Sequence, residues 1–269
     1  MRINFFEEVS LDPKETSKAT LLDFPSTVFL AAHSFDQFAG LREWLRRINP
    51  KLEAGYWHVA EESRWLSPFS YPSEIENVLN ETERIKEKGL KILLDLELPF
   101  KNPMNFMFMR PFSAENKKKL KNLFYSLKNN NIEILTAEWT PVGKSSDIAM
   151  NIFGTSYSIR RHPHKRIRMY YSSLLYPIKA DDDRTLKHKK KLEIRMKNFL
   201  INEREKYGGL VQIGLGITAQ GVYNEPLIKP EDLERDLEFA RSAGFDTATI
   251  FRVGGLNEDY MKVIKKYVS

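Results

Sequence analysis

The sequence predicts one (β/α)8 barrel over residues 1–269, and three observations support this. Eight short apolar segments have the length of strands, helical patterns separate most of them, and 269 residues is a normal size for such a barrel. Strands that alternate with helices pair in parallel through right-handed crossovers. An open doubly wound sheet would satisfy the same alternation, but the length and the count of eight favour the closed barrel.

The expected strands are short apolar runs, several with polar residues at alternate positions. They are residues 2–9, 27–34, 54–60, 91–98, 132–139, 166–173, 210–217 and 247–254. No linker or low-complexity segment interrupts the series, so we expect a single domain.

The expected helices show apolar residues at a 3.6-residue period. They are residues 35–48, 72–89, 115–131, 183–207, 229–245 and 257–268, with short helices near 12–22 and 145–153. Pro72 and Pro230 stand where a helix tolerates proline, near its first turn, and Gly89 and Gly244 are typical stop signals.

The composition is that of a soluble globular protein with a large core, since 42% of the residues are hydrophobic and 29% are charged. No apolar run approaches the ~20 residues that span a membrane. The start, MRINFFEEVS, has acids where a signal peptide needs apolar residues, so we expect no export signal and a cytoplasmic location. Cysteine is absent, which excludes disulfides and thiol chemistry. Helices rich in Lys and Glu are also typical of a thermophile.

The net charge of +6 comes largely from two basic runs, residues 159–168 and 186–191. Such runs could meet phosphates or nucleic acid. Charge runs are more often solvated surface, and no nucleic-acid-binding motif accompanies these two. We therefore expect a small-molecule ligand and no nucleic-acid or membrane partner; the oligomeric state is open.

The stretch KILLDLELPF, residues 91–100, carries two carboxylates in an apolar strand. Side chains of a strand alternate between two faces. We therefore expect Leu94, Leu96 and Leu98 to face the helices, and Lys91, Leu93, Asp95 and Glu97 to face the barrel axis. Glu97 would then stand at the C-terminal mouth, where barrel enzymes have their active sites.

We expect polar side chains of other strands at the same mouth. They are Glu8, His33, Tyr56, His58, Glu138, Tyr171 and Gln212, with Arg252 as a further candidate if it, rather than Phe251, faces inward. The competing interpretation is structural: the basic residues Lys91, Arg168 or Arg252 could neutralise the acids in buried salt bridges. His33 and His58 could likewise be ordinary hydrogen-bonded histidines.

Paired carboxylates suit glycoside hydrolysis, in which one acid protonates the leaving oxygen and a second group stabilises or attacks the anomeric carbon. Adjacent strands lie about 4.8 Å apart, so we expect Glu138 beside Glu97. Several acids in a low-dielectric mouth raise the pKa of one of them. We therefore expect Glu97 to be a general acid, with Asp95 or Glu138 as its anionic partner.

We expect two loops with aromatic residues to border this pocket and hold sugar rings. Residues 61–71 contain Trp65, Phe69 and Tyr71, and residues 100–113 contain Phe106, Phe108 and Phe112. Long loops in compact domains often bind ligands. The same aromatics could instead pack on the barrel or form a subunit contact.

The Asp95-x-Glu97 pair, together with Met169 and Tyr171 of the sixth expected strand, resembles the chitinase-like glycoside hydrolases. Their motifs are D-x-x-D-x-D-x-E and M-x-Y-D. The resemblance implies that Glu97 is the acid and that Asp95 orients the N-acetyl group of the substrate. This chain departs from the motifs at the other Asp positions, which hold Leu90, Leu93 and Ser172. The triplet Asn224-Glu225-Pro226 is similar to another barrel glycosidase motif, but it follows the seventh strand instead of the fourth and was interpreted as coincidence.

The main alternative is a phosphosugar isomerase or epimerase, because barrels often bind phosphate at the loops after strands seven and eight. Glycines let backbone amides approach an anion, and both loops contain them: Gly214, Gly216, Gly254 and Gly255. Glycines in tight turns would explain the same pattern. An inward lysine at the end of strand six is absent, which disfavours a Schiff-base aldolase.

A divalent-metal enzyme and a non-catalytic binding barrel are further alternatives. Glu8, Glu97, Glu138 and His33 could hold a divalent ion. The one H-x-H pair, His162 and His164, lies among basic residues that disfavour a metal, so we expect no metal site and no cofactor. A binding barrel would be favoured if the acids were salt-bridged and the mouth blocked.

Overall fold

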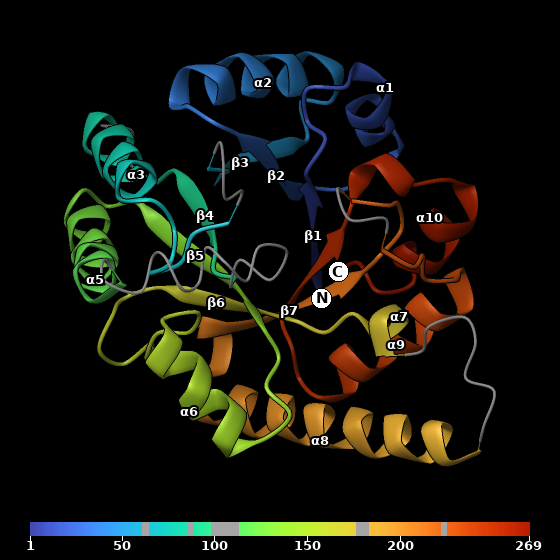
Figure 1. Ribbon diagram of the computed structural model, residues 1–269. Helices are drawn as coiled ribbons and strands as arrows, with labels where there is room; N and C mark the ends of the chain where they lie inside the picture. The colour runs from blue at the N-terminus through green and yellow to red at the C-terminus, as the bar shows by residue number, and fades with distance from the viewer. Residues whose placement is uncertain (61–64, 86–88, 98–112, 176–182, 222–224) are drawn as a thin grey trace.

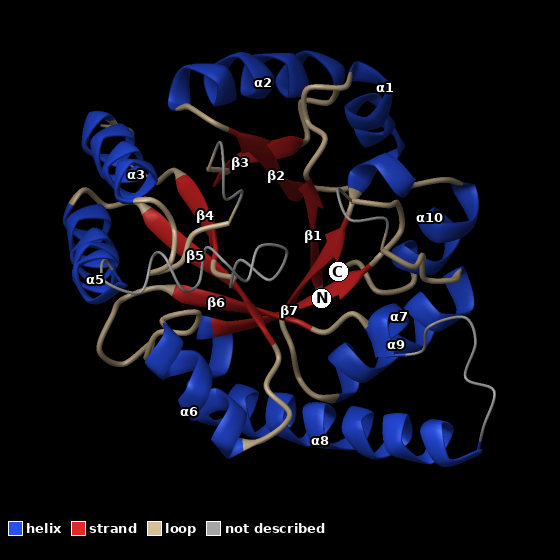
Figure 2. Ribbon diagram, viewed as in Figure 1, coloured by secondary structure: helices blue, strands red, loops and turns tan. Residues whose placement is uncertain are grey.

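The computed structural model describes residues 1–60, 65–85, 89–97, 113–175, 183–221 and 225–269. Eight parallel strands close into a barrel in chain order, β1 to β8, and helices surround it (Figures 1 and 2). The ladder closes where β8 pairs with β1, with Asn4 opposite Thr249. The (β/α)8 barrel predicted from the sequence is therefore confirmed.

Each expected strand overlaps one observed strand. The strands are β1 (Arg2–Glu7), β2 (Ser26–Ala32), β3 (Leu52–His58), β4 (Lys91–Asp95), β5 (Glu133–Trp139), β6 (Lys165–Met169), β7 (Val211–Gly216) and β8 (Thr247–Phe251). Most were expected to run two to four residues further. Some of those extra residues, among them Glu8, Glu97 and Tyr171, line a pocket at the C-terminal mouth.

The helices follow the predicted pattern closely. They are α1 (Pro13–Thr16), α2 (Phe35–Ile48), α3 (Pro72–Arg84), α5 (Ser113–Asn129), α6 (Lys144–Phe153), α7 (Ser172–Leu175), α8 (Asp183–Tyr207), α9 (Pro230–Ser242) and α10 (Glu258–Lys265), with 3-10 turns at Ser17–Leu21, Gly208–Leu210 and Val253–Gly255. Helix α7 was not expected, because its first two residues were assigned to the end of a strand. Among the described helices, none combines the length and apolarity that crossing a membrane requires.

Side chains from the strands form two separate apolar layers. The outer layer fills the space between the strands and the helices and includes Leu94 and Leu96. The inner layer lies inside the barrel and includes Leu93. The predicted alternation of β4 is thus confirmed for these leucines, whereas Leu98 lies outside the described residues.

Candidate functional site

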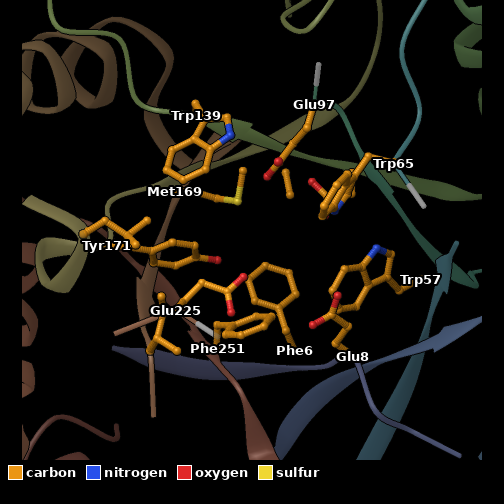
Figure 3. Close-up of a pocket in the computed structure, with 14 residues that line it drawn as sticks. Phe6, Glu8, Trp57, Trp65, Glu97, Trp139, Met169, Tyr171, Glu225 and Phe251 are labelled. Atoms are coloured by element: carbon orange, nitrogen blue, oxygen red, sulfur yellow. The ribbon is translucent and has the colours of Figure 1, made fainter. Parts of the chain in front are cut away.

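A pocket of about 310 Å³ opens at the C-terminal mouth of the barrel. Figure 3 shows its walls, which come from both the strand ends and the loops that follow them. The lining residues are Phe6, Glu8, Trp57, Trp65, Asp95, Glu97, Ala137, Trp139, Met169, Tyr171, Leu174, Ile217, Glu225 and Phe251. This is the end of the barrel at which enzymes of this fold place their active sites.

Four carboxylates line this pocket, and none of its described lining residues is Lys, Arg or His. Asp95 is the last residue of β4 and Glu97 follows two positions later, so the strand alternation carries both to the inner face. Glu8 directly follows β1, and Glu225 belongs to the long connection between β7 and α9. The described lining of the pocket therefore concentrates carboxyl groups from three parts of the chain.

Burial and mutual repulsion raise the pKa values of the two carboxyl groups of β4. Burial is the largest cause of the raised pKa of Asp95, and the charges of Glu97 and Glu8 raise it further. The pKa of Glu97 rises to about 8, first through burial and then through the charges of Glu8 and Glu225. At a pKa of about 8, the carboxyl group of Glu97 keeps its proton at neutral pH and can donate it.

Glu8 and Glu225 approach each other across Gly221. The amide of Gly221 donates a hydrogen bond to Glu225 Oε2 at 3.0 Å. A Cβ added to Gly221 would lie 2.6 Å from Glu8 Oε2 and 3.0 Å from Glu225 Oε2. Glycine is therefore the residue that lets the loop after β7 bring these two carboxylates to one side of the pocket.

Aromatic side chains form most of the remaining wall. The rings of Phe6 and Trp57 are 5.6 Å apart, and those of Tyr171 lie 6.1 Å from both Trp139 and Phe251. Figure 3 shows the indole nitrogen of Trp139 toward Glu97, and this N–H favours the ionised form of Glu97 without cancelling the upward shift of its pKa. Burial and the surrounding carboxylates raise the pKa of Tyr171 well above its ordinary value, so its hydroxyl stays protonated as a hydrogen-bond donor.

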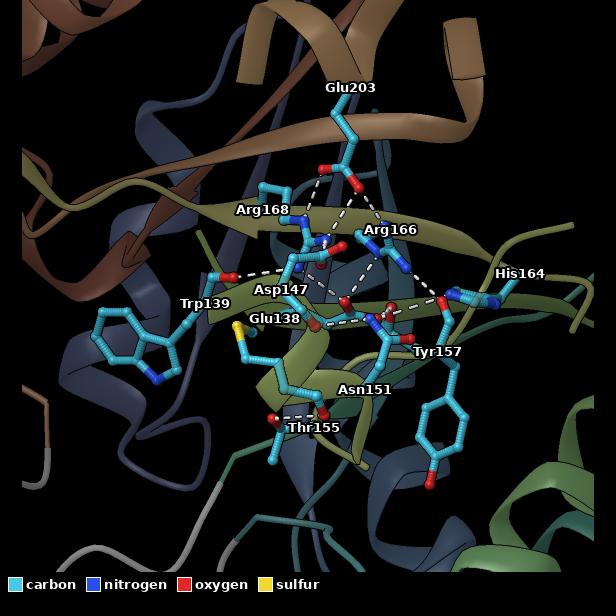
Figure 4. Close-up of polar contacts among 12 residues, drawn as sticks. Glu138, Trp139, Asp147, Asn151, Thr155, Tyr157, His164, Arg166, Arg168 and Glu203 are labelled. Carbon is cyan, nitrogen blue, oxygen red and sulfur yellow. Dashed lines mark hydrogen bonds and ion pairs between the residues drawn. The ribbon is translucent and has the colours of Figure 1, made fainter. Parts of the chain in front are cut away.

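Glu138 does not belong to this pocket, and its expected position beside Glu97 is wrong. On β5 the inward side chains are Ala137 and Trp139, so Glu138 points outward into the layer beneath α8. There it accepts from Arg168 at 3.0 Å and lies 2.8 Å from Arg166 Nε (Figure 4). Burial alone would raise the pKa of Glu138, but the two guanidinium charges bring it well below its ordinary value. Glu138 is the salt-bridged acid that the structural alternative anticipated.

Tyr56, His58 and His33 also lie outside the pocket, contrary to expectation. On β3 it is Trp57 that faces inward. Tyr56 is fully buried in the outer layer, where its hydroxyl lies 2.8 Å from His58 Nδ1. Burial lowers the pKa of His58 to about 4, so this imidazole stays neutral. His33 is exposed, and its Nδ1 lies 2.9 Å from the carbonyl of Val59.

Arg252 and Gln212 are likewise separate from the pocket. Phe251 is the inward residue at the end of β8, whereas Arg252 donates to Glu7 at 2.7 Å and to Glu15 at 2.9 Å. Gln212 does face the barrel interior, but it lines a different cavity at the N-terminal end together with Lys91. The open choice between Phe251 and Arg252 is thus decided for Phe251.

The four glycines assigned to a phosphate site make close contacts within the protein. A Cβ on Gly216 would lie 2.5 Å from the carbonyl oxygen of Phe251, and one on Gly214 would lie 3.3 Å from Ile167. Gly255 packs equally closely on the backbone of Thr218.

The amide of Gly254 already has an anionic partner. It donates to Glu7 Oε2 at 2.6 Å, and Glu7 also accepts from Arg252. The amide of Gly254 is therefore already hydrogen-bonded to a carboxylate of the protein itself.

The two aromatic loops contribute unequally. Trp65 lines the pocket as expected. Phe69 is buried against Phe153, with ring centroids 6.3 Å apart, and Tyr71 precedes the first turn of α3. The remaining residues of these loops, 61–64 and 100–112 with Phe106, Phe108 and Phe112, lie outside the described residues.

The sequence reasoning missed several pocket residues. Trp57 and Trp139 were passed over because their polar neighbours were assigned to the inner face. Glu225 was set aside as a coincidental motif match, and only the return of its loop to the barrel mouth brings it to Glu8. The signal for the tryptophans was present: aromatic residues at strand ends are as typical of a sugar pocket as the acids are.

The described residues contain no group of three or more His, Asp or Glu side chains suited to hold a metal ion. The acids of the pocket are spread over its walls (Figure 3). The site of this (β/α)8 barrel is thus an acidic, aromatic-walled pocket built without a recognisable metal cluster among the described side chains.

No protein-family model matches the sequence, and no curated protein matches it. The fold is similar to solved structures of glycoside hydrolases over nearly the whole chain. The PgaB (BpsB) glycoside hydrolase domain of Bordetella bronchiseptica has a TM-score of 0.60 at 11% identity, covering 100% of this chain and 98% of that one. A thermostable chitinase domain of Pyrococcus furiosus, solved with chito-oligosaccharides, has a TM-score of 0.55 at 11% identity, covering 99% and 94%.

The spore cortex-lytic enzyme SleL of Bacillus cereus has a TM-score of 0.57 at 8% identity, covering 100% of this chain and 74% of that one. At such identities the likeness is one of fold. It agrees with the architecture that the sequence predicted. A reaction has to be argued from the residues of the pocket.

Proposed function

We propose that this protein hydrolyses glycosidic bonds, with Glu97 as the general acid and Asp95 as its carboxyl partner on the same face of β4. The observation that carries the proposal is the placement of both carboxyl groups on the inner face of β4, in a pocket whose other walls are aromatic. Apolar faces of sugar rings stack on aromatic side chains, while carboxyl groups perform the acid and base steps. The resemblance of Asp95-x-Glu97 to chitinase-like enzymes and the likeness of the fold to glycoside hydrolases support it.

In this mechanism the protonated Glu97 donates its proton to the glycosidic oxygen as the bond to the anomeric carbon breaks. Positive charge develops on the sugar ring, and ionised carboxylates around the pocket stabilise it. Water then adds its oxygen to the anomeric carbon and its proton returns to Glu97. The raised pKa of Glu97 keeps this acid protonated at neutral pH before the reaction begins.

The electrostatics of the pocket favour this function over the phosphosugar alternative. A phosphate ester would bring two negative charges to four carboxylates, and the described lining offers no basic side chain to receive it. After β8, the amide of Gly254 is already hydrogen-bonded to Glu7, which also disfavours an anion there. The pocket supports a neutral or cationic substrate.

The proposal is tested by screening aryl glycosides and oligosaccharides with the parent protein and with Glu97→Gln. Loss of a positioned general acid costs about 10²- to 10⁴-fold in rate. We expect that loss in kcat with little change in binding, and a smaller loss on aryl glycosides whose leaving group needs little protonation. Glu43→Gln, an exposed position on α2, is the matched control and should keep the parent rate. Turnover of ordinary glycosides by Glu97→Gln at the parent rate would refute the assignment of the acid.

A further inference from the structure

Exposed apolar side chains gather on two neighbouring helices, α6 and α8, on the outside of the barrel (Figure 1). Helix α6 buries none of its residues, and its Ile148 and Ile152 are 59% and 67% exposed. Ile194 of α8 is 59% exposed. Single exposed hydrophobic residues are normal on a protein surface, whereas a group of them indicates an interaction site. These three isoleucines therefore indicate a surface that contacts a partner.

A groove of about 1020 Å³ lies between the same two helices. Its basic lining residues are Lys144 of α6, Arg195 and Lys206 of α8, and the buried Arg166 of β6. The three basic residues of the helices form no ion pair with any described residue. The acids of the groove, Asp147 and Glu203, instead bind Arg168 at 3.3 and 2.7 Å. The groove therefore has an excess of positive charge.

Both basic runs of the sequence contribute to this face. Lys187, Lys191 and Arg195 follow one another at four-residue intervals on α8, so they lie in one row, and all three are exposed. From the run 159–168, Arg160 lies over the ring of Tyr207, which lines the groove, with 5.8 Å between the guanidinium carbon and the ring centroid. Two basic runs that are distant in the sequence thus meet beside one groove.

The first turn of α6 adds backbone donors to the groove. Gly143, Lys144 and Ser145 all line it, and no side chain caps this end of the helix. The amides at a helix N-terminus attract anions, phosphates among them. An anion in the groove would therefore receive hydrogen bonds from the backbone of α6 and be attracted by the basic side chains around it.

The isoleucines distinguish between the anionic partners that would fit these charges. A nucleic acid or a soluble phosphate would satisfy the basic residues but leave the exposed faces of Ile148, Ile152 and Ile194 in water. A second copy of this chain would cover the isoleucines, but it would bring two positively charged faces together. The surface of an anionic phospholipid bilayer offers phosphates next to hydrocarbon, and basic residues beside exposed apolar ones suit both.

We propose that the face formed by α6 and α8 binds the surface of an anionic phospholipid bilayer. Headgroup phosphates occupy the groove beside Lys144 and Arg195, while Ile148, Ile152 and Ile194 reach the boundary of the acyl chains. This contact lies on the membrane surface and requires no spanning helix. The expectation of no membrane partner considered only apolar runs long enough to cross a bilayer. The contact is independent of the chemistry proposed for the pocket.

The test measures binding of the intact protein to sedimented vesicles of phosphatidylcholine alone and of equal parts phosphatidylcholine and phosphatidylglycerol. We expect binding to the anionic vesicles to be at least about tenfold tighter and to weaken with added salt, because each basic residue near such a surface contributes about fivefold and salt screens its charge. A basic variant, Lys144→Gln with Arg195→Gln, should bind about tenfold or more weakly. An isoleucine variant, Ile148→Ser with Ile152→Ser, should also lose about tenfold, because it removes apolar surface from the contact.

The matched control combines Leu11→Ser with Lys14→Gln. These are an exposed apolar and an exposed basic residue beside α1, on the other side of the barrel from α6 (Figure 1). The control should bind as the parent does. Thermal melting of every variant checks that the fold is retained.

Equal binding to both kinds of vesicle, or binding to neither, would overturn the inference. Parent-like binding by the isoleucine variant or by the basic variant would overturn it as well. Inorganic phosphate and a single-stranded oligonucleotide are tested in parallel: binding of either one without binding to vesicles would assign the groove to a soluble anion. Self-association that is lost in the isoleucine variant, again without binding to vesicles, would assign the face to a second copy of the chain.

Discussion

Glu138 and Arg168 stand opposite each other in the β5–β6 ladder, and their side chains meet outside the barrel at 3.0 Å. Arg168 also binds Glu203 of α8 at 2.7 Å, so the pair ties two strands to the longest helix (Figure 4). All three side chains are buried. The acid that looked like a catalytic partner in the sequence therefore joins the barrel to its outer layer.

Replacing Glu138 by Gln should lower the free energy of unfolding by about 3–5 kcal/mol, because it leaves Arg166 and Arg168 buried without their carboxylate. The folded pKa of Glu138 lies below its ordinary value of 4.5, so its contribution is complete above that pH and is lost as the pH falls. Urea unfolding at pH 7 and pH 4 measures both effects. Ligand binding at the pocket should persist in the folded variant, and a stability equal to the parent at pH 7 would contradict the prediction.

Replacing Glu97 by Gln should have the opposite effect on stability. The pKa of Glu97 rises from 4.5 to about 8 on folding, so the native state binds this proton more tightly than the unfolded chain does. The sign is therefore reversed: the parent loses stability as the pH rises from 4.5 to 8. The Gln variant avoids this loss and should be more stable by about 1–2 kcal/mol at pH 8, after allowance for partial exposure, and nearly equal at pH 5. Melting curves between pH 5 and pH 8 measure this difference in stability. A Gln variant that is less stable than the parent at pH 8 would show that folding does not raise the pKa of Glu97.

Replacing Glu225 by Gln should move the pH profile of any hydrolysis. The charge of Glu225 contributes to the raised pKa of Glu97. Without it, Glu97 loses its proton at lower pH, so the alkaline limb of kcat should shift to lower pH while the maximum rate changes less. A pH–rate series on one substrate measures the shift, with Glu43→Gln as the control. If the alkaline limb of the pH–rate profile is unchanged in the Glu225 variant, the charge of Glu225 does not raise the pKa of Glu97.

Replacing Gly221 by Ala tests the approach of Glu8 to Glu225. The added Cβ would lie 2.6 Å from Glu8 Oε2 and 2.9 Å from Phe251, so one of the walls must move. We expect ligand binding to weaken by about tenfold or more. The free energy of unfolding should fall by about 1–3 kcal/mol. Gly40→Ala is the matched control: nothing lies within 4 Å of its Cβ, and alanine in helix α2 should stabilise the protein by about 0.5–1 kcal/mol. If Gly221→Ala binds the ligand with the affinity of the parent protein, the loop accommodates the added methyl group and the prediction is wrong.

The sequence by itself determined the architecture of this protein. Apolar runs of strand length alternate with helical patterns, and this alternation fixes parallel strands with helices outside, because each pattern buries its own apolar face. The same period of two predicted that Asp95 and Glu97 share one face of β4, and their assignment to the inner face is confirmed. Glu8 and Tyr171 were placed at the mouth by the same reasoning.

Only the tertiary structure decided which face of β3 and β5 points inward. Both strands are buried on their two sides, so the sequence period of β5 fits either orientation of Trp139 and Glu138. The choice was made by partners distant in the sequence: Arg166, Arg168 and Glu203 hold Glu138 outside, and the inner rings admit Trp139. Glu225 belongs to a loop without the hydrophobic periodicity of a strand or helix, so its position near Glu8 could not be predicted from the sequence. Local alternation is a property of the chain, whereas the pairing of buried charges depends on which distant elements the closed barrel brings together.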